Sequence, residues 1–103
     1  MEQLNIFDEP PQLTDILDQL NVDWRLSTGK GYCAISYGLD IYVDGKRVGN
    51  IAYDPDRESY SEFWKVRGLW SGISRKLPPE RLHKVVAMTV EKHMVLVREK
   101  KQF

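Results

Sequence analysis

The pattern of apolar and polar residues predicts a helix near the start of the chain and strands after it. Between residues 12 and 21, leucine and isoleucine recur with the i, i+3, i+4, i+7 spacing of a helix that buries one side. Residues 1–11 end in Pro10-Pro11, a pair that cannot continue a helix or a central strand. We therefore expect a flexible N-terminal arm over residues 1–11 and a single domain over residues 12–103.

After residue 21 the apolar residues recur at every second position, as they do in strands with one buried side. The alternating runs are residues 22–26, 32–37, 39–43, 48–53 and 59–66. Asp44-Gly45 lies between two of these runs, which is the strongest short-range signal for a β-hairpin. Ser71-Gly72 and Pro78-Pro79 enclose a stretch that we expect to be a loop or a single helical turn.

The last third of the chain returns to helical spacing. From Leu82 to Val97 the apolar residues mark one side of a long helix, and Pro79 and Glu80 suit its first turn. Residues 95–97 are apolar on every side, so this end either packs deeply or is a strand. Together the elements predict an α+β fold in one small domain: a helix, an antiparallel meander of about four to five strands, and a long C-terminal helix packed on the sheet.

Length and charge exclude some classes of protein. A chain of 103 residues is large enough for one hydrophobic core and too small for two. Its net charge of zero excludes a histone-like protein that coats nucleic acid by bulk charge. The charges are nevertheless segregated, with eleven acids and five bases in residues 1–60 and four acids and ten bases in residues 61–103. No stretch has the pattern of a membrane span or a secretion signal, so we expect a cytoplasmic protein.

Signatures of catalysis and metal binding are few. Cys33 has no second cysteine with which to form a disulfide or a zinc site. His83 and His93 are about 15 Å apart along the predicted helix, which is too far to share one ion. We therefore expect no catalytic residue, no metal site and no cofactor. The alternative left open is a metal-dependent nuclease built on Asp54, Asp56 and Glu62.

Aromatic and basic residues interleave in the positive half of the chain. The candidate nucleic-acid-binding residues are Trp64, Lys65, Arg67, Trp70, Arg75 and Lys76. Such interleaving is typical of surfaces on which single-stranded nucleic acid stacks its bases while cations neutralise its backbone. The alternative is that the tryptophans fill the core of a small domain and the charges are ordinary surface residues.

A short peptide near the start of the chain resembles a known motif. Gln3-Leu4-Asn5-Ile6-Phe7 resembles the peptide by which many bacterial and phage proteins dock on the DNA polymerase sliding clamp. Gln3, Leu4, Ile6 and Phe7 match that motif, and Asn5 stands where serine or aspartate is commoner. The resemblance implies that apolar side chains enter a pocket of the clamp with micromolar affinity. The alternative is that these residues form an edge strand or fold back on the domain.

These observations lead to two classes of function. The first is a non-enzymatic accessory protein of bacterial or phage DNA metabolism that docks on the sliding clamp through Gln3, Leu4, Ile6 and Phe7. The second is a phage-type inhibitor of a host nucleic-acid machine, such as an anti-CRISPR protein, that acts through its folded domain. Both imply a protein partner, either the clamp or a host nucleic-acid-processing protein. Nucleic acid is a candidate further ligand, and no membrane partner is expected.

Overall fold

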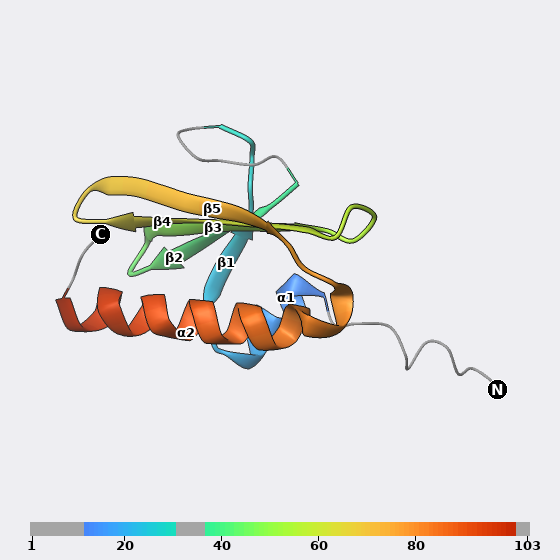
Figure 1. Ribbon diagram of the computed structural model, residues 1–103. Helices are drawn as coiled ribbons and strands as arrows, with labels where there is room; N and C mark the ends of the chain where they lie inside the picture. Colours follow the sequence, from blue (N-terminus) through green and yellow to red (C-terminus); the bar gives the residue numbers. More distant parts are fainter. Residues whose placement is uncertain (1–11, 31–36, 101–103) are drawn as a thin grey trace.

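The fold has two layers, an antiparallel sheet and a layer of helices on one of its faces (Figure 1). The structure is a computed structural model that describes residues 12–30 and 37–100. The elements in chain order are α1 (Leu13–Gln19), β1 (Asp23–Leu26), β2 (Leu39–Val43), β3 (Lys46–Asp54), β4 (Ser59–Val66), β5 (Leu69–Lys76), the 3-10 helix η2 (Pro79–Arg81) and α2 (Leu82–Lys100). This arrangement confirms the predicted α+β fold in one small domain.

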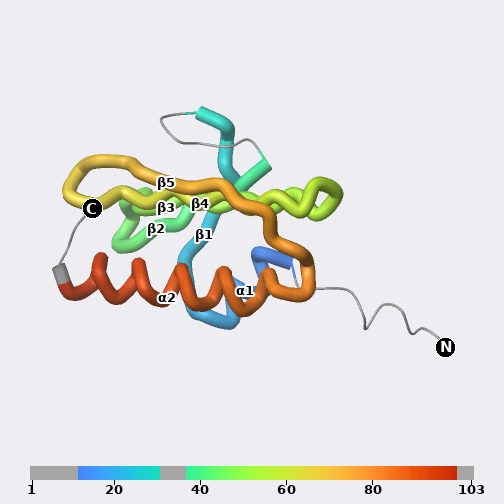
Figure 2. The backbone as a smooth tube through the Cα atoms, in the orientation of Figure 1, coloured from blue at the N-terminus to red at the C-terminus, as the bar shows by residue number. Residues whose placement is uncertain are grey.

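The five strands form a meander in the order β1-β2-β3-β4-β5, and each strand pairs antiparallel with the next. Figure 2 traces the chain back and forth across this sheet. The turns Asp44-Gly45 and Arg67-Gly68 close its two tightest hairpins, and all four residues have positive φ. Positive φ at both central residues is the condition of a type I′ turn, whose twist matches that of the strands it joins.

The hydrophobic core lies between the sheet and the helices α1 and α2, which contact each other on one face of the sheet. The largest fully buried side chains of this core are Tyr60, Ile16, Leu17, Ile41, Ile51, Leu77, Val48, Val86 and Val90. The opposite face of the sheet carries no helix in the described part of the chain, and we call it the open face. The segment from Ser27 to Lys30, which follows β1, lies on the side of the open face (Figure 1).

Most of the predicted elements are confirmed. Strand β1 lies within the run 22–26, the predicted hairpin of residues 39–53 is β2–β3, and β4 covers residues 59–66. The run 32–37 lies outside the described residues except for Tyr37, which is in a turn. The predicted N-terminal arm also lies outside them.

One prediction about a single segment is wrong, and one alternative is resolved. The expected loop around Ser71-Gly72 is the edge strand β5, because the turn Arg67-Gly68 sends the chain directly back along β4. Nearly all side chains of β5 are exposed, so burial does not impose the apolar alternation that marks the inner strands. Of the two alternatives for residues 95–97, the helix holds and the strand does not: Val97 packs in the core, and Val95 is exposed.

An extra residue in β3 decides which side chains of this strand face the helices. Ile41 pairs with Gly49, but the next residue of β2, Tyr42, pairs with Arg47, so Val48 has no partner. Such a β-bulge places two neighbouring side chains on the same side of the strand. Val48 is therefore fully buried in the core, and Arg47 turns to the open face.

The largest aromatic side chain of the core, Trp64, is held between the sheet and α2. Its cross-strand neighbour on β3 is Gly49, where an added Cβ would lie 2.7 Å from the indole ring. The imidazole of His93 on α2 stacks on the indole with ring centroids 4.3 Å apart and planes 4° apart. Glycine at position 49 therefore makes the room that Trp64 needs to pack between two layers.

We predict that Gly49→Ala destabilises the fold by about 1–3 kcal/mol, because the new methyl group forces the indole off its stacked position. Ser71→Ala is the matched control, since Ser71 flanks Trp64 on β5 but is exposed. It should change the free energy of unfolding by less than about 0.5 kcal/mol. Urea unfolding followed by circular dichroism measures both values, and equal stability of the two variants would contradict the prediction.

Candidate functional site

Aromatic and basic side chains gather on the open face of the sheet. Strand register places them on the same side as Asp40 and Asn50, away from the helices. We define the aromatic–basic face as Arg25, Tyr42, Arg47, Phe63, Lys65 and Trp70. These six residues come from all five strands, so the surface crosses the whole sheet.

Arg47 is the central cation of this face. Its guanidinium carbon lies 4.6 Å from the centroid of the Trp70 ring, so Arg47 on β3 and Trp70 on β5 are in contact above β4. Arg47 Nη1 also donates a hydrogen bond to Asp40 Oδ1 at 3.3 Å. An arginine held by a carboxylate and an aromatic ring together is restricted in orientation, which lowers the entropy it loses when a ligand binds.

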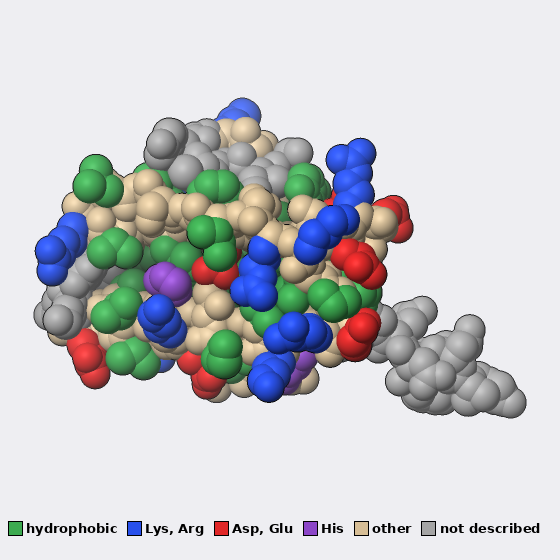
Figure 3. Space-filling model, in the orientation of Figure 1, with side chains coloured by type: hydrophobic (Ala, Val, Ile, Leu, Met, Phe, Trp, Pro, Cys, Tyr) green, Lys and Arg blue, Asp and Glu red, His purple; other side chains and the backbone are tan. Residues whose placement is uncertain are grey.

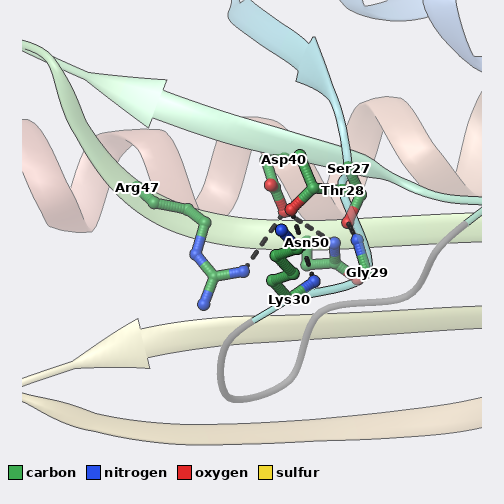
Figure 4. Close-up of polar contacts among 7 residues, drawn as sticks. All are labelled: Ser27, Thr28, Gly29, Lys30, Asp40, Arg47 and Asn50. Carbon is green, nitrogen blue, oxygen red and sulfur yellow. Dashed lines mark hydrogen bonds and ion pairs between the residues drawn. The ribbon is translucent and has the colours of Figure 1, made fainter.

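The carboxylate that holds Arg47 is itself held from the other side. Asn50 Nδ2 donates to Asp40 Oδ1 at 2.7 Å, and Figure 4 shows Asp40 between the side chains of Arg47 and Asn50. Asp40 is 7% exposed and Asn50 is fully buried. Asn50 Oδ1 has no hydrogen-bond partner among the described residues. A buried carboxylate with two donors is a rigid support, because losing either donor leaves a desolvated charge.

The segment after β1 lies close to this cluster. Figure 4 shows Ser27, Thr28, Gly29 and Lys30 on the side of Asp40 away from Arg47. Two local hydrogen bonds shape this segment, from the Gly29 amide to Ser27 Oγ at 3.2 Å and from the Lys30 amide to Thr28 Oγ1 at 3.3 Å. Ser27 is buried and the next three residues are exposed, so the segment borders the aromatic–basic face with one exposed lysine.

The remaining members of the face repeat the pairing of a cation with a ring. The Arg25 guanidinium carbon lies 4.1 Å from the centroid of the Tyr42 ring. Lys65 and Trp70 are cross-strand partners on β4 and β5. Phe63 leans over Gly72, where an added Cβ would collide with its ring. Flat rings beside fixed cations are suited to stacking nucleobases and neutralising phosphates.

The structure does not bring the six candidate residues from the sequence together on one surface. Trp64 is 3% exposed and belongs to the core, and Arg75 lies on the helix-facing side of β5. Arg67 is in the β4–β5 turn. Lys65, Trp70 and Lys76 do share the open face.

Sequence reasoning missed four members of the face, namely Arg25, Tyr42, Arg47 and Phe63. For three of them, the alternation of side chains between the two faces of a strand gives the open face once the register of the strands is known. Arg47 does not, because the extra residue Val48 reverses the alternation of β3 at this point. On β4, the position of Phe63 next to the buried Trp64 is the signal that would have placed Phe63 on the same side as Lys65.

A second polar site lies on the other side of the sheet, where β4 and β5 face α2. A groove of about 370 Å³ is lined by Glu62, Trp64, Val66, Ser71, Gly72, Ile73 and His93. Glu62 is 7% exposed and its Oε1 accepts a hydrogen bond from Trp64 Nε1 at 3.1 Å. His93 Nδ1 donates to the carbonyl of Thr89 at 2.9 Å. Burial raises the pKa of the neighbouring Tyr60 hydroxyl, and the charge of Glu62 raises it further.

Residues 12–30 and 37–100 contain no group of three histidine, cysteine or acidic side chains that could hold a metal ion. Asp54 and Asp56 lie at the β3–β4 connection, where Asp54 Oδ1 accepts from the Asp56 amide at 3.0 Å. Glu62 faces the helices from β4, whereas Asp54 lies on the open side of β3. The three acids of the nuclease alternative are therefore not gathered around one point.

Comparison with known proteins adds no relative. No family model matches the chain, and searches of curated proteins and of solved structures also found no match. Within the part of the chain that the structure describes, no helix has the length and apolar character needed to cross a membrane.

We predict that Asp40→Ala lowers the free energy of unfolding by about 2–3 kcal/mol, because Arg47 and Asn50 both lose the acceptor that they share. Asp23→Ala is the matched control, since Asp23 is an exposed acid on the same face of the sheet. Its effect should stay within about 0.5 kcal/mol. Urea denaturation of both variants gives the comparison, and an Asp40 variant as stable as the Asp23 variant would rule out this support.

Proposed function

We propose that this chain is a non-enzymatic accessory protein of bacterial or phage DNA metabolism. It docks on the sliding clamp through Gln3, Leu4, Ile6 and Phe7, and its folded domain binds single-stranded nucleic acid on the aromatic–basic face. The observation that carries the second part is the row of cations and rings across the open face, centred on Arg47 and Trp70. The clamp-docking part is supported by the sequence of the peptide alone, which lies outside the described residues.

The chemistry of the face fits single strands better than a duplex. Single-stranded nucleic acid exposes the flat faces of its bases, which stack on aromatic rings and on guanidinium planes. The aromatic rings come from β2, β4 and β5, as Tyr42, Phe63 and Trp70. The cations beside them are Arg25, Arg47 and Lys65. The open face is part of a sheet and presents no helix that could enter a major groove, in the described part of the chain.

The two parts of the proposal support each other. A peptide with a few apolar anchors binds with micromolar affinity, which is weak for a lasting complex. A folded domain that binds the DNA strand beside the clamp would raise the local concentration of the peptide, because two linked weak contacts act together. Transient recruitment to replicating DNA is the behaviour expected of such a protein.

We predict that the intact protein binds a purified bacterial sliding clamp with micromolar affinity in calorimetric titration. Leu4→Ala with Phe7→Ala should abolish the heat of binding, since these side chains are the proposed anchors. Asp8→Ala with Glu9→Ala is the control pair, which lies directly after the motif and should keep the affinity. Absence of heat from a folded wild-type protein would reject clamp docking, and an inhibitor acting through its folded domain would then be the better hypothesis.

We predict that a fluorescent oligothymidine of about 10–15 nucleotides binds the domain at low salt. Trp70→Ala should weaken binding about 5- to 150-fold through lost stacking, the equivalent of about 1–3 kcal/mol. Lys65→Ala should reduce the slope of the logarithm of the binding constant against the logarithm of the salt concentration by about one phosphate contact. Lys84→Ala, on the exposed side of α2, should leave this slope unchanged. Fluorescence anisotropy measures all three, and no binding at low salt would overturn the assignment of this face.

A further inference from the structure

Strand β5 has an open edge with a defined set of unpaired backbone groups. Because the turn has two residues, Val66 and Leu69 on either side of it form a hydrogen-bonded pair. At the other end of the hairpin, the Leu77 amide donates to the Glu58 carbonyl at 2.7 Å, so hydrogen-bonded and non-hydrogen-bonded pairs alternate in the same phase along the whole hairpin. The odd-numbered residues of β5 therefore bond to β4. The backbone groups that point away from β4 belong to Trp70, Gly72, Ser74 and Lys76. In the described part of the chain no strand pairs with this edge.

The edge is long and apolar enough to be covered by another chain. β5 has eight residues, against four in the other edge strand, β1. Ile73 is 54% exposed and Leu69 is 74% exposed, both on the side that faces the helices. Figure 3 shows hydrophobic side chains at the surface where the sheet edge faces α2. Exposed edges of this length usually carry protection against pairing. β5 contains no proline, and its two charged residues, Arg75 and Lys76, are confined to its C-terminal end.

The sequence of β5 is complementary to itself in one antiparallel register. If Ile73 faces Ile73 of a second copy, Trp70 faces Lys76, Gly72 faces Ser74 and Ser71 faces Arg75. In this register the unpaired backbone groups of the two β5 strands lie opposite each other, and the two Ile73 side chains meet at the centre. No cation of one copy lies opposite a cation of the other. The register shifted by two residues, centred on Gly72, would instead set Arg75 against Leu69 and Ile73 against Ser71.

The groove beside β5 adds charge complementarity. Ser71 and Ile73 line this groove, which holds the buried Glu62 carboxylate. In the Ile73-centred register the Arg75 of the second copy lies opposite Ser71, at the edge of the groove. A cation of the second copy thus approaches an acidic groove on the helix side. On the open side, Lys76 of the second copy lies opposite Trp70, and its ammonium group donates to the Arg57 carbonyl of its own chain at 2.8 Å.

We propose that the protein forms a two-fold symmetric dimer in which β5 pairs antiparallel with β5 of a second copy, centred on Ile73. The two five-stranded sheets become one continuous sheet of ten strands, with both α2 helices on the same side. This proposal does not depend on nucleic-acid binding. If the proposed function holds, the dimer also completes the site, because each Trp70 gains a lysine from the other copy and the two aromatic–basic faces join.

Light scattering coupled to size exclusion tests the dimer directly. At about 10–100 micromolar protein, the molar mass should approach twice the 12.0 kDa of one chain. Ile73→Lys places two ammonium groups against each other at the two-fold axis and should raise the dissociation constant at least about tenfold. Met88→Lys is the matched control, since Met88 is 62% exposed on α2 and outside the proposed interface. It should leave the mass unchanged.

Disulfide cross-linking tests the register without relying on the lysine variant. In a Cys33→Ser background, Ile73→Cys should form a disulfide between copies, because facing residues of a non-hydrogen-bonded pair lie about 4.5 Å apart. Ser71→Cys is the control, since its counterpart in the second copy would lie about 13 Å away along the strand. A monomeric mass throughout this range, a dimer insensitive to Ile73→Lys, or faster cross-linking at position 71 would each overturn the proposal.

Discussion

The extra residue of β3 is the constraint on which both faces of the sheet depend. A regular strand would send alternate side chains of this segment to opposite faces and leave Val48 outside the core. The bulge instead buries Val48 and turns Arg47 to the open face, where Asp40 and the Trp70 ring hold it. One inserted residue thus completes the core on one side and supplies the central cation of the aromatic–basic face on the other.

Strand β4 shows how two neighbouring aromatic residues serve different purposes. Trp64 faces the helices, where Gly49 and His93 enclose its indole ring. Phe63 faces the open side and leans over Gly72. In each case the ring lies across a glycine of the adjacent strand, because only a residue without a side chain leaves room for it. Neighbouring aromatic residues therefore serve opposite faces: Trp64 stabilises the core, and Phe63 forms part of the surface.

The sequence allowed the fold class to be predicted because the hairpin signal Asp44-Gly45 and the long apolar spacing of α2 are local properties. Strand β5 was not predictable in the same way, since an exposed edge strand needs no apolar alternation. The candidate site was predictable only in part. Proximity in sequence grouped Trp64 with Lys65 and Trp70, whereas strand parity separates Trp64 from the other two. Arg47 joins them through a tertiary contact that no local pattern contains.

The best-ordered polar side chains of the domain fix other side chains in place, on both faces of the sheet. On the open face, Asp40 and Asn50 hold the guanidinium of Arg47 in place. The acid and the imidazole of the groove, Glu62 and His93, are each engaged with the core, through the Trp64 indole. Their shared partner ties both groups to the packing of the sheet against α2, so moving either one would disturb the core. A surface whose cations and rings are already fixed loses little conformational entropy when a ligand contacts it.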